Sequence, residues 1–197
     1  ADSTVRVISG NFITARPMGI VDGVDFKHSG VVRKVDTAFI RRTLDMGALV
    51  LISPFGFSPT GEAFNLAMEE VATSVAIALK ADKLVFFTEI DGIRVRPFEP
   101  AAEDNPIDTE LSLADARRLL AALPQEQARL PDLNSTAPDF YLRHCVKACV
   151  SGVERSHIIP FAQDGAILQE IYVHDGIGTM VVDERLEELR PATADDV

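Results

Sequence analysis

The sequence contains no apolar stretch that approaches the length of a membrane span, because proline, glycine or charged residues interrupt each candidate run. It also has no secretory signal pattern at its start. Both absences argue against a membrane partner, and they predict a cytoplasmic protein.

Basic residues are also scarce. The 197 residues include 19 lysines and arginines against 30 aspartates and glutamates, which gives a formal net charge of −11. Nucleic-acid binding needs clustered basic side chains, so that class of partner is excluded. An apolar content of 47% and a charged content of 25% are instead typical of a globular chain with one sizeable core.

Cysteine occurs only twice in the sequence. Cys145 and Cys149 lie four positions apart on a predicted helix, with His144 beside them. These side chains could begin a metal site, but the rest of a four-ligand set is missing nearby. We therefore interpret the two cysteines as buried structural thiols in a reducing compartment, and we predict no metal.

Hydrophobic periodicity predicts strands and helices along the whole chain. Alternation or short apolar runs predict strands at 5–8, 11–16, 30–35, 48–53, 83–88, 154–159 and 179–182. Helical spacing predicts helices at 37–46, 65–80, 113–123, 139–150 and 165–173. Asp36 and Ser112 are suited to cap the first and third of these helices.

The same patterns predict how some elements are arranged. The first two strands are expected to form a hairpin across Ser9 and Gly10. The run 48–53 is apolar throughout, so we expect a strand buried on both faces, followed by a loop over 53–61. Strand, helix and strand over 48–88 form the repeating unit of a parallel sheet, which indicates the α/β class.

Two motifs carry a resemblance to a known family. One is the run Ser58-Pro59-Thr60-Gly61-Glu62-Ala63-Phe64-Asn65-Leu66. The other places His157 and Glu170 thirteen positions apart, ahead of the turn Gly176-Ile177-Gly178-Thr179. Together they resemble the amino-acid-kinase-like domain of bacterial N-acetylglutamate synthases, and the resemblance extends over nearly all of the chain.

The resemblance implies an α/β fold, namely a three-layer αβα sandwich with a mainly parallel sheet of the carbamate kinase-like (amino-acid kinase) type. Residues 1–182 would be the C-terminal part of that domain, without its first lobe. Residues 183–197 would be a linker and the start of an absent GNAT-type acetyltransferase domain, since Arg190-Pro191-Ala192-Thr193 resembles the opening of such a domain.

The resemblance also implies an effector site for L-arginine. In arginine-sensitive relatives the equivalent histidine and glutamate bind the amino acid, which here assigns His157, Glu170 and Gly176, with Ile177 and Gly178 as supporting backbone. The chemistry suits these residue types, because a carboxylate receives a guanidinium through two parallel hydrogen bonds. Glycines let the backbone come close to a ligand.

Simpler interpretations of these residues stay open at this point. His157 could be a hydrogen-bonded histidine at a strand edge, and Glu170 could be a solvated acid on an apolar helix. Gly176 and Gly178 could merely shape the turn that follows the helix.

A kinase activity is the first alternative function, and the sequence argues against it. There is no Gly-Gly phosphate loop, and no lysine lies at phosphate-loop spacing from the glycines present. Acetylglutamate kinases carry Asn-x-Asn-Ala-Asp where this chain has Asn65 to Glu69, so Asn65 is retained and Glu69 replaces the aspartate. We interpret these as degenerate kinase-site positions and predict no catalytic residue in this chain.

The implied function is therefore regulatory. The intact enzyme would transfer acetyl from acetyl-CoA to the α-amine of L-glutamate, in the first step of arginine biosynthesis, and arginine would inhibit it through this domain. No cofactor is expected in the chain itself, and a homo-oligomer is expected. The second alternative is a purely structural oligomerisation domain that binds no arginine.

Overall fold

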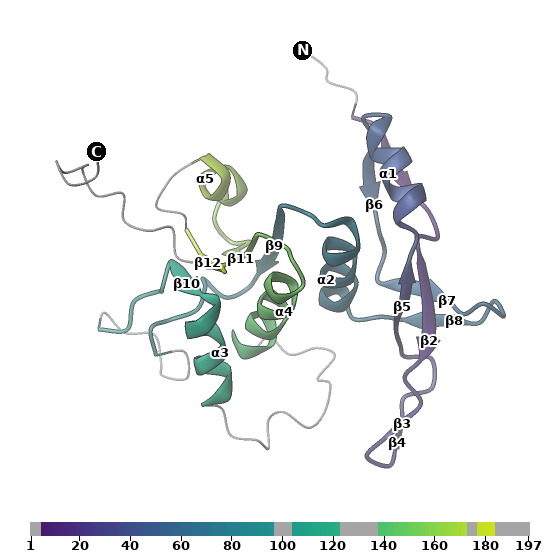
Figure 1. The fold of residues 1–197 in the computed structure, drawn as a ribbon, viewed down its shortest axis with the longest axis horizontal. Coiled ribbons are helices and arrows are strands. Elements are labelled where there is room, and N and C mark those ends of the chain that lie inside the picture. The colour runs from purple at the N-terminus through teal and green to yellow at the C-terminus, as the bar shows by residue number, and fades with distance from the viewer. Residues whose placement is uncertain (1–4, 97–103, 123–137, 173–176, 184–197) are drawn as a thin grey trace, which may run out of the picture.

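The computed structural model describes residues 5–96, 104–122, 138–172 and 177–183. Four sheets and five helices lie within these residues, and α2 (Met68–Leu79) stands between two groups of strands (Figure 1). Parallel strand pairs occur on both sides of α2, as an α/β fold requires. No helix in these ranges is both long and apolar enough to cross a bilayer.

The sheet that positions the candidate site has the order β10-β12-β11-β9. It consists of β9 (Lys83–Thr88), β10 (Glu110–Ser112), β11 (Arg155–Pro160) and β12 (Thr179–Val182). Strand β11 runs parallel to β9 and antiparallel to β12, while β12 runs parallel to β10. Strand β11 is therefore paired on both of its edges, which makes it an interior strand.

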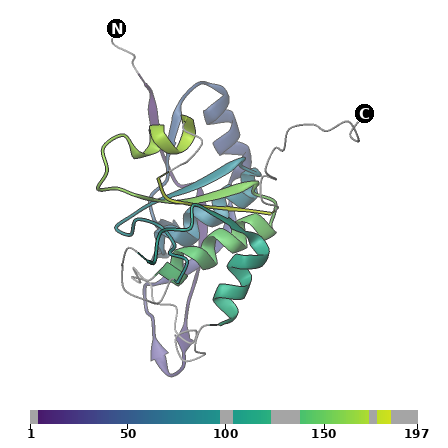
Figure 2. The same cartoon turned by 90° about the vertical axis from the view of Figure 1, so that its left-hand side faces the viewer.

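Helices cover this sheet from both sides, which gives the three layers expected from the sequence. Helices α3 (Leu113–Ala121) and α4 (Pro138–Val150) lie against one face, and α5 (Ala166–Tyr172) lies against the other (Figures 1 and 2). Because successive residues of a strand point to opposite faces, Ser156 and Ile158 turn towards α4 while His157 turns towards α5.

The larger hydrophobic core lies between this sheet and helices α2, α3 and α4. Helix α4 contributes the large side chains of Tyr141 and Leu142 to this core, together with the small residues Cys145, Ala148 and Cys149. Both cysteines are buried free thiols, and Cys149 Sγ donates to the carbonyl of Val181 at 3.5 Å. The expectation of buried structural thiols is confirmed.

The other strands lie beyond α2. Strand β1 (Val7–Ser9) pairs in parallel with β6 (Leu49–Leu51), and β3 (Ile20–Val21) pairs with β4 (Val24–Asp25). A four-stranded sheet joins β5 (Gly30–Val35), β2 (Ile13–Pro17), β7 (Phe55–Phe57) and β8 (Ala63–Asn65) in that order. Helix α1 (Thr37–Asp45) packs on β6, as both are drawn side by side in Figure 1.

Two predicted helix caps are confirmed. The Asp36 carboxylate accepts from the backbone N–H of Phe39 at 3.0 Å, at the start of α1. The Ser112 hydroxyl accepts from the N–H of Asp115 at 3.0 Å, at the start of α3. Each cap satisfies a backbone donor that the first turn of a helix leaves without a partner.

The predicted N-terminal hairpin is wrong. Strands β1 and β2 belong to different sheets, since β1 pairs with β6 and β2 pairs with β5. The link between them is held by Phe12, which is 1% exposed and has its ring 5.3 Å from that of Phe39. Burial of this one aromatic side chain therefore redirects the chain where the alternation alone predicted a turn.

The predictions for 48–65 also need correction. Strand β6 is not buried on both faces, because Leu49 and Leu51 are 50% and 54% exposed. The predicted loop over 53–61 instead holds β7, which pairs with β8 across a turn in which the Ser58 hydroxyl accepts from the N–H of Glu62. Helix α2 consequently begins at Met68, three residues after the predicted start.

Strands β6 and β9 flank α2, but they do not pair with each other within the described residues. A cavity of about 330 Å³ lies between them, lined by apolar side chains that include Val50, Val71 and Leu84. The predicted strand–helix–strand order is therefore present, while the predicted single sheet through both strands is not. Of the apolar side chains in the run 48–53, Val50 and Ile52 line this cavity, Leu49 and Leu51 are exposed, and Ala48 is buried.

Candidate functional site

His157 lies in the middle of the interior strand β11, and its side chain is 4% exposed. The expectation of a position at a strand edge is therefore wrong. The imidazole Nδ1 lies 2.6 Å from the Oε1 atom of Glu170. The two residues, thirteen positions apart in sequence, thus meet on the face of the sheet that α5 covers.

Glu170 comes from α5 and is just as deeply enclosed, with its side chain 5% exposed. Its second oxygen, Oε2, accepts from the backbone N–H of Ile177 at 3.0 Å. Both carboxylate oxygens therefore have partners, and the interpretation of Glu170 as a solvated acid is wrong. Histidine, glutamate and the turn before β12 converge on one point, as the family resemblance implied.

The pKa of Glu170 reflects two opposing causes. Burial raises the pKa, but the hydrogen bonds from His157 and from the backbone of Ile177 and Gly178 lower it more, so the pKa ends below its usual range. The group is therefore a carboxylate near neutral pH. Because an ionised carboxylate only accepts hydrogen bonds, Nδ1 of His157 must carry the proton between them.

The other ring nitrogen of His157 is left without a partner. Nε2 is buried, and no hydrogen-bond partner reaches it among the described residues. Buried polar atoms in proteins are nearly always hydrogen-bonded, so an orphan of this kind calls for an explanation. In the neutral ring with Nδ1 protonated, Nε2 is an acceptor, which suits a ligand rich in N–H groups.

Gly178 has a packing reason to be glycine. A Cβ atom at this position would collide with the carbonyl oxygen of Ile158 in β11 and would lie 2.9 Å from the side chain of Ile159. The close approach is thus between two backbone segments, and it fixes the turn beside Glu170. Gly176, which the sequence assigned to the same site, lies outside the described residues.

The two degenerate kinase-site positions lie on different elements. Asn65 is exposed at the end of β8, and Glu69 is buried in the first turn of α2. Glu70, beside it, accepts from the N–H of Val32 at 3.3 Å and so ties the helix to β5. The acidic first turn of α2 therefore has a structural use that needs no phosphoryl chemistry.

A second polar cluster, between α2 and α4, was missed by sequence reasoning. The Thr73 hydroxyl donates to the Glu69 carbonyl and lies 3.1 Å from Nδ1 of His144. Burial lowers the pKa of His144 to about 4, helped by Lys147, and burial together with Glu89 raises the pKa of Tyr141 to about 12. The regular spacing of polar residues on α2 could have signalled it, but their partners lie far along the chain.

No metal centre is apparent in the ranges that the structure describes. No group of three or more histidine, cysteine, aspartate or glutamate side chains is placed there to hold an ion. The candidate site is thus an acceptor pair, a carboxylate and an imidazole, joined to a backbone turn.

Burial raises the pKa of both thiols on α4, which fits their packing role.

Comparison with known proteins places the chain among relatives of one kind. The sequence pattern of the amino acid kinase family matches residues 3–160. An amino-acid acetyltransferase from Ralstonia nicotianae is 51% identical over 197 residues, covering 100% of this chain and 40% of the relative. One from Aeromonas salmonicida is 45% identical over 196 residues, covering 100% of this chain and 42% of the relative.

Solved structures agree with the sequence relatives. N-acetylglutamate synthase from Neisseria gonorrhoeae, complexed with coenzyme A and L-arginine, superposes with a TM-score of 0.78 at 37% identity, covering 100% of this chain and 42% of that one. Carbamate kinase from Giardia lamblia, bound to AMP-PNP, gives 0.56 at 14% identity over 78% of this chain and 46% of that one, which supports the fold alone. The chain thus spans about two fifths of the length of its curated relatives.

Proposed function

The chain belongs to the amino acid kinase family, and we propose that it is the arginine-binding regulatory region of an amino-acid acetyltransferase. The observation that carries the proposal is the enclosed pair of His157 and Glu170 beside the turn at Ile177. Support comes from the similarity of this whole chain to 42% of a synthase whose structure holds L-arginine.

Arginine suits the groups that the site offers. Its guanidinium presents five N–H donors in a plane, and a carboxylate such as that of Glu170 can accept two of them in parallel. The unpartnered Nε2 of His157 is a further acceptor. The net charge of −11 also favours a cationic ligand over an anionic one, although it does not select arginine by itself.

The complete enzyme would transfer the acetyl group of acetyl-CoA to the α-amine of L-glutamate. In this arrangement residues 1–182 form the kinase-like domain, and residues 183–197 lead to a GNAT-type domain that carries the chemistry. Acetyl-CoA is a substrate there, and the kinase-like domain needs no cofactor. The enzyme would act in the cytoplasm as a homo-oligomer, without nucleic-acid or membrane partners.

Arginine would regulate the enzyme by shifting a population of domain arrangements. A ligand moves such an equilibrium only as far as its affinities for the two arrangements differ. We therefore propose that the His157–Glu170 site binds arginine more tightly in the arrangement with low acetyltransferase activity. The kinase-like domain itself would neither acetylate nor phosphorylate glutamate.

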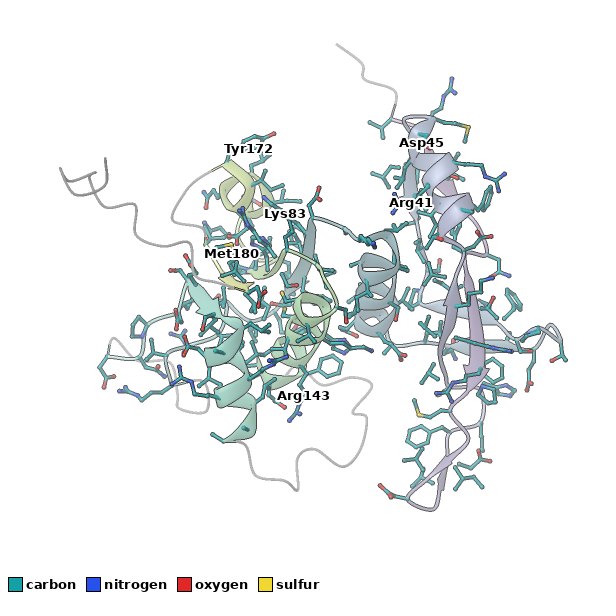
Figure 3. The ribbon with its side chains drawn as sticks, viewed as in Figure 1. Arg41, Asp45, Lys83, Arg143, Tyr172 and Met180 are labelled. Carbon is teal, nitrogen blue, oxygen red and sulfur yellow. The ribbon has the colours of Figure 1, made fainter. Side chains whose placement is uncertain are left out.

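A second candidate function is a contact surface for assembly. Helix α5 exposes Ile167, Leu168, Ile171 and Tyr172, and the last of these is 80% exposed. Tyr172 points away from the sheet in Figure 3. Such an apolar helix face is typical of surfaces that bind another protein segment. This role is compatible with arginine binding, but alone it predicts that arginine has no effect.

The first experiment measures acetyl transfer to L-glutamate by the protein as its gene encodes it, with and without L-arginine. We expect arginine to inhibit the wild type and to lose most of that inhibition in Glu170→Gln, because the neutral amide is a weaker acceptor for a guanidinium. Glu154→Gln changes an exposed acid directly before β11 and should keep full inhibition. Equal inhibition of all three proteins would contradict the proposal.

A further inference from the structure

The donors that surround Glu170 form a recognisable pattern. Nδ1–H of His157 and N–H of Ile177 come from different elements, yet they reach the two oxygens of one carboxylate, at 2.6 Å and 3.0 Å. The carboxylate is 5% exposed, so water does not compete with these donors. Two converging donors with one oxygen each are the arrangement by which proteins receive a free carboxylate.

We propose that His157 and Ile177 form a carboxylate receptor that Glu170 occupies in the absence of ligand. The α-carboxylate of an amino-acid effector takes the place of the Glu170 carboxylate, and Glu170 turns to receive the cationic end of the same effector. This inference rests on the proposed function, because it specifies how the proposed arginine site binds its ligand.

The burial of the pair favours such an exchange. Both oxygens of Glu170 already have a partner, and the side chains of His157 and Glu170 are 4% and 5% exposed. A guanidinium that approached this arrangement would find the carboxylate enclosed and held by two donors. If Glu170 moved away without replacement, two buried donors would lose their acceptor, at a cost in free energy that a ligand carboxylate avoids.

Helix α5 is suited to move with Glu170. Among its seven residues Ala166 is buried, whereas Ile167, Leu168, Ile171 and Tyr172 are exposed. The helix packs chiefly on β11, so the enclosed carboxylate is a main anchor between α5 and the sheet. Exchange of that anchor for a ligand carboxylate would release the helix and carry the effector signal to its exposed apolar face.

The unpartnered Nε2 of His157 is part of the same proposal. In the occupied arrangement this acceptor is buried without a donor. An effector whose N–H groups lie at the far end of a flexible side chain, as those of a guanidinium do, can reach this nitrogen while its carboxylate is bound at Nδ1. The receptor therefore favours an effector with a cationic side chain over a plain carboxylate, and the Glu170 carboxylate adds to this preference.

The test compares L-arginine with agmatine, which has the same guanidinium and lacks the carboxylate. Titration calorimetry uses the protein as its gene encodes it. We expect arginine to bind at least about tenfold more tightly than agmatine. His157→Asn, whose amide N–H can stand where Nδ1–H stood, should keep most of this preference, and His157→Gln should lose more of it. Equal affinities of the wild type for the two ligands would overturn the inference.

A second test needs no effector. Glu170→Ala vacates the receptor, so sodium acetate should raise the midpoint of thermal unfolding of this variant by several degrees more than sodium chloride at equal ionic strength. The wild type, in which Glu170 fills the receptor, should show only the general difference between the two salts, which is smaller. An acetate effect that is no larger in a folded Glu170→Ala protein than in the wild type would also overturn the inference. If neither arginine nor agmatine binds while acetate stabilises the variant, the receptor stands and the proposed effector function fails.

Discussion

Two titratable side chains, Glu170 and His144, show how burial acts on single residues of this chain. Burial alone disfavours the charged form of each group. Glu170 stays ionised because donors surround it, whereas His144 has Lys147 nearby and becomes neutral. The same physical cause thus leaves a charged carboxylate at the candidate site and an uncharged imidazole in the α2–α4 contact.

His144 should make stability depend on pH. Its pKa is about 4 in the folded chain and near 6.5 when unfolded, so the unfolded state binds the extra proton between these values. Stability is fully present above about pH 6.5 and is lost as the pH falls towards 4, by about 1–3 kcal/mol. Urea unfolding across this range measures the effect.

Two variants serve as controls for that measurement. His144→Asn removes the titration and keeps an N–H for the Thr73 hydroxyl, so its stability should vary less between pH 6.5 and 4. His28→Asn alters an exposed histidine and should follow the wild type. A pH dependence that persists unchanged in His144→Asn would show that another group is responsible.

At the scale of elements, the approach of the turn before β12 to β11 holds the candidate site in place. Gly178 allows this approach, because any Cβ there would meet the Ile158 carbonyl. We expect Gly178→Ala to lower the free energy of unfolding by about 2–4 kcal/mol, since a backbone oxygen cannot step aside as a flexible side chain does. Urea unfolding of the variant is the measurement.

Gly165→Ala is the matched comparison for this substitution. Gly165 has a φ of +76° and nothing within 4 Å of an added Cβ, so its replacement costs only the strain of a left-handed residue, about 1–2 kcal/mol. Gly178→Ala should therefore be the more damaging of the two. A smaller loss for Gly178→Ala would mean that the turn before β12 can shift freely.

The elements that could be predicted from the sequence are those whose signals are local. Asp36 and Ser112 mark the starts of α1 and α3, and the apolar runs mark β9, β11 and β12. The predictions of a hairpin at β1 and β2 and of a loop at β7 were wrong, because Phe12 and Phe57 have their partners far along the chain. Periodicity reports which residues are apolar and does not report what they pack against.

The candidate site, too, could be predicted only in part. The family resemblance implied that His157 and Glu170 share one site, and their side chains do meet. Two further facts depend on how α5 packs against β11. Both oxygens of Glu170 have partners, and Nε2 of His157 has none among the described residues. Neither fact has a sequence signal, because each follows from the distance between two elements.

At the scale of the whole molecule, the proposed role of the chain is to receive a signal rather than to catalyse a reaction. Its similarity to amino-acid acetyltransferases runs over 196 to 197 residues while covering about two fifths of their length. The proposed acetyl transfer therefore belongs to a different part of such an enzyme. The kinase-like fold contributes an enclosed carboxylate on α5 that is hydrogen-bonded to an imidazole on β11.

The proposed arginine site is best tested by titration calorimetry of L-arginine into the protein as its gene encodes it, with Glu170→Gln and Glu154→Gln in parallel. We expect saturable binding to the wild type and to Glu154→Gln, and an affinity at least about tenfold lower for Glu170→Gln. An absence of heat with folded wild-type protein, or equal affinity in Glu170→Gln, would contradict the proposed site.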